Sequence, residues 1–267
     1  MSTPDPSDLL DLALATAREA GDLIVRLRAE GVEVAATKSS GTDIVTLADQ
    51  ASEHLVKERL LGARPDDGML GEEGDDLRGT SGVVWIVDPI DGTVNYLYGL
   101  PHFAVSIAAE VDGEVVAGVV VAPALGLEYA ASRGGGATCN GVAIATRPVV
   151  PLGERLVGTG FSYEQEARTR EAAYLGMLMP HIRDIRRLGS CALDICAVAS
   201  GLLDAYVEEG PHVWDHAAAG LVCAEAGGTL EVARSPVGKR LLICAPAKGY
   251  DDFRAAVVEA GFVGGGG

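Results

Sequence analysis

The stretch WIVDPIDGT, residues 85–93, passes from an apolar run directly into two aspartates. The run begins at Val83 and is rich in β-branched and aromatic side chains, which is typical of a buried strand. Pro89 lacks a backbone N–H, so we expect it to end the hydrogen-bond ladder of that strand. The stretch therefore predicts a buried strand that stops abruptly at polar residues.

Asp88 and Asp91 lie three residues apart across the turn that follows, so both can point to one side. Two carboxylates alone repel each other, and one of them takes up a proton. Together with Mg²⁺, which prefers oxygen ligands and binds substrate phosphate, the same pair forms a metal site. Gly92 and Thr93 then offer backbone N–H groups that suit a phosphate oxygen. An ordinary β-turn with capping aspartates explains residues 88–93 alone equally well.

Two further acidic stretches lie near predicted element ends: GEEG, residues 71–74, and WDHAA, residues 214–218. Taken alone, Glu72 and Glu73 are typical of a solvated acidic loop. Asp215 alone is typical of a helix N-cap. The occurrence of all three acidic stretches at the ends of strands and helices favours a metal site.

The first half of the chain is predicted to mix helices and strands. Apolar residues at helical spacing predict a helix over residues 8–30, capped by Ser7, and a second over 46–61, in which Glu53 pairs with Lys57. Residues 64–81 are rich in Gly, Asp and Pro and are expected to be mostly loop. The predicted strands cover residues 83–87, 103–111, 114–121 and 127–132, and Asp112-Gly113 is a hairpin signal between the second and third.

The second half of the chain alternates between the two kinds of element. Strands are predicted at 156–160, 182–187, 204–208, 229–232 and 241–244, and helices at 168–179, 190–200, 215–225 and 251–260. Two prolines and a glycine within residues 147–153 suggest a joint. We therefore expect an α+β half, residues 1–150, and an α/β half, residues 151–267, in one catalytic unit.

Composition narrows the function classes. The chain has 38 acidic and 21 basic residues, a formal charge of −17, which argues against nucleic acid and anionic membranes as partners. No run of apolar residues is long enough to span a membrane, and the N-terminus does not resemble a signal peptide. The five scattered cysteines predict free thiols in a reducing compartment. These observations predict a cytoplasmic protein that acts on a small molecule.

Several common catalytic motifs are missing from the sequence, including the phosphate loop, the Gly-x-Ser-x-Gly elbow and His-Glu-x-x-His. The run Gly134 to Gly136 lacks the dinucleotide-binding spacing and is interpreted as a hairpin turn. The histidines show no ligand spacing, and His216, beside Asp215, is interpreted as structural.

The acidic motifs together resemble those of the inositol monophosphatase family. The matching stretches are GEE at 71–73, WIVDPIDGTVNY at 85–96 and WDHAAAG at 214–220, supported by KSSGTD at 38–43, Asp49, CNG at 139–141 and EAGG at 225–228. The resemblance covers residues 8 to 260. It implies a layered αβαβα sandwich and a Mg²⁺-dependent phosphomonoesterase, usually a homodimer.

The resemblance also implies roles for individual residues. Glu72, Asp88 and the carbonyl of Ile90 bind one Mg²⁺, Asp88, Asp91 and Asp215 bind a second, and a weaker third ion lies near Glu72. Thr93, held by Asp49, orients the water for in-line attack on the phosphate, and the amides of Gly92 and Thr93 hold the phosphate. The remaining implied residues are Gly189, Ser190, Cys191 and Glu208 at the substrate hydroxyls and Lys38 and Asp43 in a mobile segment.

The expected substrate is a small phosphate monoester, with myo-inositol monophosphate favoured. Residues 95–103, NYLYGLPHF, resemble inositol phosphatases, and the match at Glu208 favours a polyol. The alternatives are fructose-1,6-bisphosphatase, histidinol-phosphatase, NADP phosphatase and adenosine 3′,5′-bisphosphate phosphatase. A regulatory member without turnover is a further alternative, against which the intact carboxylates argue.

Overall fold

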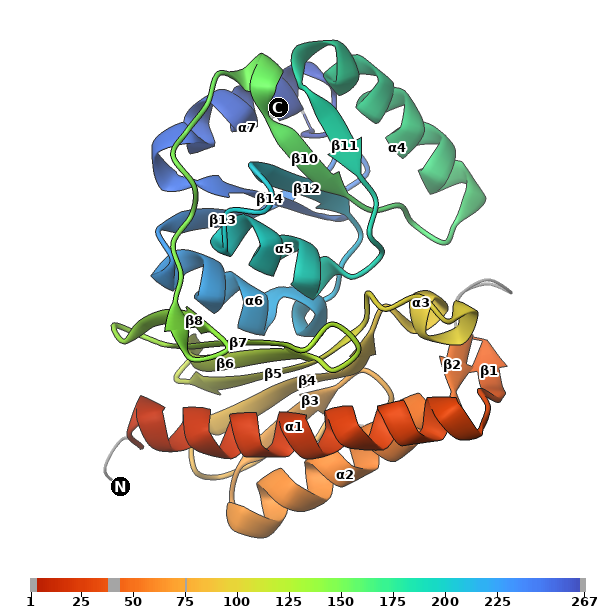
Figure 1. The fold of residues 1–267 in the computed structure, drawn as a ribbon, viewed down its shortest axis with the longest axis vertical. Helices are drawn as coiled ribbons and strands as arrows, with labels where there is room; N and C mark the ends of the chain where they lie inside the picture. Colours follow the sequence, from red (N-terminus) through yellow and green to blue (C-terminus); the bar gives the residue numbers. More distant parts are fainter. Residues whose placement is uncertain (1–3, 38–43, 75, 265–267) are drawn as a thin grey trace.

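Helices and sheets alternate in layers in the computed structural model, which describes residues 4–37, 44–74 and 76–264 (Figure 1). The outermost helices on one side are α1 (Pro6–Glu30) and α2 (Leu47–Ala63). Between the two large sheets lie α5 (Cys191–Ala199) and α6 (Val213–Glu225), and the other outer face carries α4 (Gln165–Leu178) and α7 (Tyr250–Glu259). The expected αβαβα sandwich is confirmed.

Within the described residues, the first large sheet has the strand order β3-β4-β5-β6-β7-β8-β9, and we call it the N-terminal sheet. Only β3 and β4 run parallel in it. Its strands are β3 (Gly68–Gly71), β4 (Val83–Asp91), β5 (Ala104–Val111), β6 (Glu114–Ala122), β7 (Leu127–Ser132), β8 (Gly136–Cys139) and β9 (Val142–Ala143). The hairpin predicted at Asp112-Gly113 joins β5 to β6, and both turn residues have positive φ.

The second large sheet, called the C-terminal sheet, has the strand order β11-β10-β12-β14-β13. Its strands are β10 (Leu156–Thr159), β11 (Asp184–Arg186), β12 (Ala205–Glu209), β13 (Gly228–Arg234) and β14 (Arg240–Pro246). The smaller elements are the strand pair β1 (Val34–Thr37) and β2 (Ile44–Thr46), the helix α3 (Thr93–Tyr98), and the 3-10 turns Leu152–Glu154, Met179–His181 and Ala247–Gly249.

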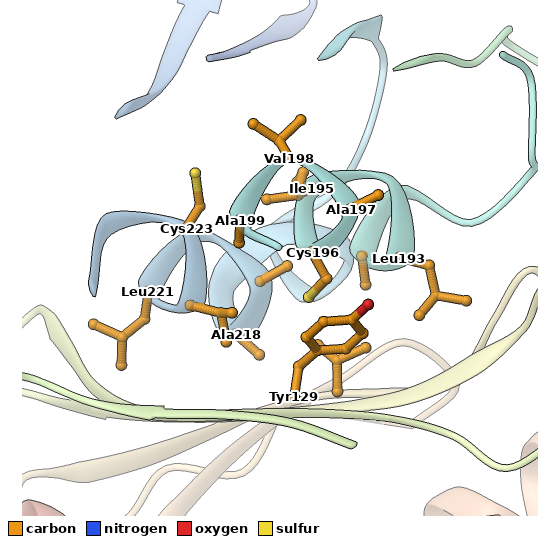
Figure 2. Close-up of a cluster of buried hydrophobic side chains, with 14 of the residues drawn as sticks. Tyr129, Leu193, Ile195, Cys196, Ala197, Val198, Ala199, Ala218, Leu221 and Cys223 are labelled. Atoms are coloured by element: carbon orange, nitrogen blue, oxygen red, sulfur yellow. The ribbon is translucent and has the colours of Figure 1, made fainter. Parts of the chain in front are cut away.

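The described residues form three apolar cores: one between α1, α2 and the N-terminal sheet, one around α5 and α6 that reaches both large sheets, and one between the C-terminal sheet and α4 and α7. In the middle layer, α5 and α6 are apolar on nearly all sides because both faces are covered by sheets. Figure 2 shows the two helices above the N-terminal sheet, with Cys196 of α5 beside Tyr129 and Leu221 of α6 pointing toward the sheet. The described cysteines are all free thiols, as expected. The middle helices are thus fixed from both sides, and so are the residues at their N-termini.

Three local expectations are corrected by the structure. Most of the stretch 64–81 is loop, as expected, but it also contains β3, four residues that pair with β4 and, at Met69, form a bridge with Leu77. Pro89 does not end its strand: β4 continues to Asp91 through a bulge, and its pairing with β3 stops before the proline, so no ladder N–H is needed there. The cap of α1 is Asp5, whose carboxylate accepts hydrogen bonds from the N–H and hydroxyl of Ser7.

Candidate metal and phosphate site

Three aspartates from two layers meet at one end of the sandwich. Asp88 and Asp91 come from the last residues of β4, and Asp215 comes from the first turn of α6. Each offers one carboxylate oxygen to a group whose members all lie within 4.8 Å of one another. Asp88 and Asp91 are buried, and among the described residues none of the three forms an ion pair with a lysine or arginine. Such a group can hold a divalent cation.

The electrostatics of this cluster agree with a cation site. Burial raises the pKa of Asp88 well above its usual range, and the charges of Glu72, Asp91 and Asp215 raise it further. Burial also raises the pKa of Asp215, with a contribution from Asp91 and Glu72. The pKa of Asp91 is raised less, to about 6, because Ser190 and the α5 backbone donate hydrogen bonds to it. A bound cation would offset this repulsion.

The N-terminus of α5 holds Asp91. Ser190 caps the helix and donates its hydroxyl to Asp91 Oδ2 at 2.5 Å. The backbone N–H of Ala192 donates to the same oxygen at 2.7 Å, and that of Cys191 to Oδ1 at 3.3 Å. The family resemblance implies Ser190 and Cys191 as substrate contacts, and both residues do line the cavity. The Ser190 hydroxyl and the Cys191 N–H, however, donate their hydrogen bonds to the Asp91 carboxylate.

Asp215 belongs to the first turn of α6 but is not its N-cap. His212 is the N-cap, and its backbone N–H donates to Asp215 Oδ2 at 2.5 Å. The His212 ring stacks on Trp214 with centroids 4.7 Å apart. Next to Asp215, His216 is buried on the same helix, and burial together with the charge of Arg240 lowers its pKa to about 4. A neutral, buried His216 fits the structural role expected for it.

The loop with Glu72 is held by a residue on α2. Glu53 is 7% exposed, and its Oε2 accepts the backbone N–H of Glu73 at 2.8 Å. A Cβ at Gly71 or Gly74 would lie within 2.6 Å of the Glu53 carboxylate, so both glycines are needed for this approach. Sequence reasoning placed Glu53 in a helix-surface pair with Lys57. The GxxG spacing around Glu72 is the signal that could have indicated the close contact.

The hydroxyl of Thr93 lies at the start of α3. It donates to Asp49 Oδ1 at 3.2 Å and lies 3.0 Å from the carbonyl of Ile90. Asp49 is also the third residue of α2, where its other oxygen accepts the hydroxyl and N–H of Thr46. Burial raises the pKa of Asp49 to about 6, although these hydrogen bonds favour its charged form. The predicted pair of Thr93 and Asp49 is thus in contact.

The start of α3 packs closely against the backbone of the loop that precedes α5. Gly92 has φ +95°, and a Cβ there would lie 2.8 Å from the carbonyl of His102 and 3.1 Å from that of Gly189. Asn95 donates its side-chain amide to the carbonyls of His102 and Leu188, at 2.7 and 2.8 Å. Asn95 thus positions both loops, a contact that no sequence pattern indicated.

Glu208 reaches the same cavity from the end of β12. Its carboxylate accepts the hydroxyl of Tyr206 at 2.5 Å and packs directly on Gly160, where a Cβ would overlap it. Burial raises the pKa of Glu208 to about 7, and the charge of Arg187 opposes that rise. Gly160 was not predicted as a site residue. Its contact with Glu208 arises only from the pairing of β10 with β12, which the sequence does not indicate.

A single cavity of about 710 Å³ is lined by most of the predicted residues: Glu72, Asp88, Ile90, Asp91, Gly92, Thr93, Gly189, Ser190, Cys191, Glu208 and Asp215. Asp49 is buried behind Thr93 and does not line it. Lys38 and Asp43 lie outside the described residues. The volume is within the ~300–1,000 Å³ of typical small-molecule sites.

The layered fold around this cavity is that of phosphatases of the inositol monophosphatase and fructose-1,6-bisphosphatase type. The chain belongs to the inositol monophosphatase family, whose model matches residues 5–260. Members of this family are phosphatases and generally depend on Mg²⁺. No described helix is long and apolar enough to cross a membrane.

Three relatives illustrate the similarity. The inositol-1-monophosphatase of Mycobacterium leprae is 42% identical over 97% of both chains. The solved structure of Mycobacterium tuberculosis SuhB, 38% identical, covers 98% of this chain and 100% of its own with a TM-score of 0.84. The protein named Nus factor SuhB of Pseudomonas aeruginosa is 38% identical over 82% of this chain and 83% of its own.

Proposed function

We propose that this chain hydrolyses myo-inositol monophosphate to inositol and phosphate in a Mg²⁺-dependent reaction. The observation that carries the proposal is the cluster of Asp88, Asp91 and Asp215, whose oxygens converge within 4.8 Å. Buried carboxylates at such spacing are unfavourable unless a cation or protons neutralise them. The names of the relatives support inositol monophosphate as the substrate.

The residues present fit a set of two to three Mg²⁺ ions. All candidate ligands are oxygens, the donors that Mg²⁺ prefers. Glu72, Asp88 and the carbonyl of Ile90 would hold one ion, and Asp88, Asp91 and Asp215 a second, with a third near Glu72. When bound, the ions would lower the pKa of water, neutralise phosphoryl oxygens and stabilise the leaving alkoxide.

The residues of the protein itself would position the attacking water and the phosphate. Thr93 donates its hydroxyl proton to Asp49 or Ile90, so its lone pairs remain to accept a hydrogen bond from the attacking water. The amides of Gly92 and Thr93 would bind a phosphate oxygen. Positioning of this kind provides most of the catalysis in phosphoryl transfer.

Recognition of the alcohol part is assigned to the wall of the cavity that carries Glu208. We propose that Glu208 accepts hydrogen bonds from substrate hydroxyls, with Gly189, Ser190 and Cys191 beside it. Because Ser190 and the amide of Cys191 already donate to Asp91, their contribution includes holding that carboxylate in place.

A phosphate-release assay tests this proposal. Purified protein with Mg²⁺ should release phosphate from inositol 1-phosphate, and EDTA should abolish the release. The panel should include fructose 1,6-bisphosphate, histidinol phosphate, NADP and adenosine 3′,5′-bisphosphate. A higher kcat/KM for one of these than for inositol 1-phosphate would replace the proposed substrate.

The second candidate is a role without turnover. It is favoured by the relatives named Nus factor SuhB. The same assay separates the two, because a chain with this role alone releases no phosphate from any monoester. A homodimer in the cytoplasm completes the proposal, and light scattering of the purified protein tests the dimer.

A further inference from the structure

Tyr206 lies behind the cavity, on the same face of β12 as Glu208. The two residues are two positions apart in the strand, so their side chains point to the same side of the C-terminal sheet. Glu208 lines the cavity, whereas Tyr206 is fully buried and does not line it. A ligand in the cavity therefore meets Glu208 but not Tyr206, although the Tyr206 hydroxyl donates to Glu208 Oε2 at 2.5 Å.

The neighbouring strand leaves room for both side chains. Tyr206 is paired with Gly158 of β10, and Gly160 follows two residues later beside Glu208. A Cβ at Gly158 would lie 3.2 Å from the Tyr206 ring, and a Cβ at Gly160 would overlap the Glu208 carboxylate. Glycines at alternate positions thus allow the tyrosine and the glutamate to pack directly on the adjacent backbone.

The hydrogen bond between these side chains determines how Glu208 can meet a substrate. Among the described residues, Tyr206 is the only one that donates a hydrogen bond to this carboxylate. A phenol has a single proton to donate, and an ionised carboxylate only accepts hydrogen bonds. Because Oε2 accepts the phenol proton, the carboxylate is held in one orientation, and Oε1 remains an acceptor for a hydroxyl of the ligand.

The same hydrogen bond favours the charged form of Glu208. Burial raises the pKa of Glu208 to about 7, and the hydrogen bond from Tyr206 opposes that rise. The charge of Arg187 also lowers this pKa, while the charges of Asp91 and Glu171 raise it. Without the phenol, a larger share of Glu208 would be protonated near neutral pH and would be a weaker acceptor.

We propose that Tyr206 is a positioning residue for substrate specificity, which holds Glu208 as an acceptor so that the cavity selects polyol phosphates over monoesters without hydroxyls. A site built to bind a hydroxyl discriminates against a ligand without one, because the acceptor is then left unpaired. Such discrimination requires that the acceptor be fixed in place by its own supporting contacts. The inference rests on the proposed phosphatase function.

The test compares two monoesters with the same ring. myo-Inositol 1-phosphate carries a hydroxyl on each of the remaining ring carbons, and cyclohexyl phosphate carries none. The wild-type protein should favour the inositol compound in kcat/KM by about 100-fold or more. Tyr206→Phe should lower this ratio about tenfold, a typical effect of one hydrogen bond to a charged group. Partial unfolding of the variant reduces both values of kcat/KM in proportion and leaves their ratio unchanged.

Two further variants establish whether Tyr206 acts through Glu208. Glu208→Ala removes the acceptor and should lower the ratio by about tenfold or more. Adding Tyr206→Phe to Glu208→Ala should then change the ratio by less than about threefold, because the two residues contribute through one interaction. Tyr129→Phe is the matched control and should keep the wild-type ratio. Tyr129 is also a buried strand tyrosine, but its hydroxyl faces Ser200 and Cys139 and does not line the cavity.

The outcomes separate the two proposals. If the protein hydrolyses both monoesters equally well, or if Tyr206→Phe keeps the wild-type ratio, the inference is overturned but the phosphatase function is not. The inference also fails if Tyr206→Phe has its full effect in the absence of the Glu208 carboxylate. If neither monoester is hydrolysed, the proposed function fails, and calorimetric titration of both compounds with Mg²⁺ decides about Tyr206. Tighter binding of inositol 1-phosphate that Tyr206→Phe removes supports the positioning role, and a preference that is absent or retained overturns it.

Discussion

Thr93 and Asp49 are joined by a hydrogen bond of 3.2 Å, and through it the candidate site is connected to the first turn of α2. One oxygen of Asp49 accepts the Thr93 hydroxyl, and the other caps the helix through Thr46. A single buried carboxylate therefore fixes both a helix terminus and the hydroxyl proposed to orient water. Asp49 is consequently expected to affect stability and turnover together.

Asp49→Asn tests this double role. The amide can keep one acceptor but not both, so we expect kcat to fall by about 10–100-fold and stability by ~1 kcal/mol, a typical value for a lost cap. Thr93→Ala should lower kcat more than it raises KM, with little change in stability. Steady-state kinetics and denaturant unfolding measure these effects. A Thr93→Ala protein that changes only in KM would contradict the proposed orienting role.

Asp215→Asn should separate metal binding from folding. We expect at least a 100-fold loss of Mg²⁺-dependent phosphate release, because the second proposed metal position loses a charged ligand. Without metal at pH 8, the variant should melt at a higher temperature than the wild type, because one carboxylate of a mutually repelling cluster is gone. Calorimetry with and without EDTA checks this, and wild-type turnover in the variant would rule out the ligand assignment.

The titration of Glu208 is expected to make the stability of the protein depend on pH. Its pKa is about 7 in the folded state and ~4.5 in the unfolded chain, so between these values the folded state holds a proton that the unfolded state has released. This contribution to stability is therefore lost as the pH rises through about 7, by at most ~3 kcal/mol. Unfolding at pH 5.5 and pH 8 should show a smaller difference for Glu208→Gln than for the wild type. Equal differences would show that Glu208 does not titrate in this range.

Gly160→Ala tests the support of Glu208 from behind. The added Cβ overlaps the carboxylate, so Glu208 must move, and we expect a rise in KM for inositol 1-phosphate with a destabilisation of ~1–3 kcal/mol. Gly153→Ala is the control, because its nearest neighbour is 4.0 Å away. Steady-state kinetics of both variants at saturating Mg²⁺ measure the change in KM. An unchanged KM in Gly160→Ala would contradict the proposed contact between Glu208 and the substrate.

Glu53→Gln tests the support of the Glu72 loop. Glu53 accepts the N–H of Glu73 and fits against two glycines, so loss of its charge should weaken the loop and lower Mg²⁺ affinity by about 10–100-fold. Glu58→Gln, on the exposed face of the same helix, should leave the affinity unchanged. The activity of both variants and of the wild type is measured as a function of Mg²⁺ concentration. Identical midpoints would contradict the proposed support of the Glu72 loop by Glu53.

The sequence allowed prediction of those features that depend on local pattern. The apolar run before Asp88, the hairpin at Asp112 and the helices of the second half are confirmed because each is specified by neighbouring residues. The strand β3 was missed, since four residues with a glycine at each end form a strand only through their partners, which are β4 and, at Met69, Leu77. The continuation past Pro89 was also missed, because it depends on where the neighbouring strand stops.

The residues that support the site were harder to predict than those that line it. Asp88, Asp91 and Asp215 stand out because several acidic stretches occur together at element ends, although each of them alone is typical of a turn or a cap. Glu53 and Asn95 act through contacts with residues distant in the chain, and Glu53 lies in a helix where a surface pair is the ordinary interpretation of a glutamate. Such contacts are fixed by the packing of the layers, which local patterns do not specify.

The position of Asp215 has a consequence for synthesis of the chain. Asp91 and Asp215 meet in space but are 124 residues apart in sequence. At about 5–20 residues per second, a ribosome needs roughly 6 to 25 s to pass from the first to the second. During that interval the N-terminal sheet can form while its carboxylates still lack their third partner. The candidate site is therefore completed only after α6 has been made, and a chain truncated before α6 contains every strand of the N-terminal sheet but lacks one of the three aspartates.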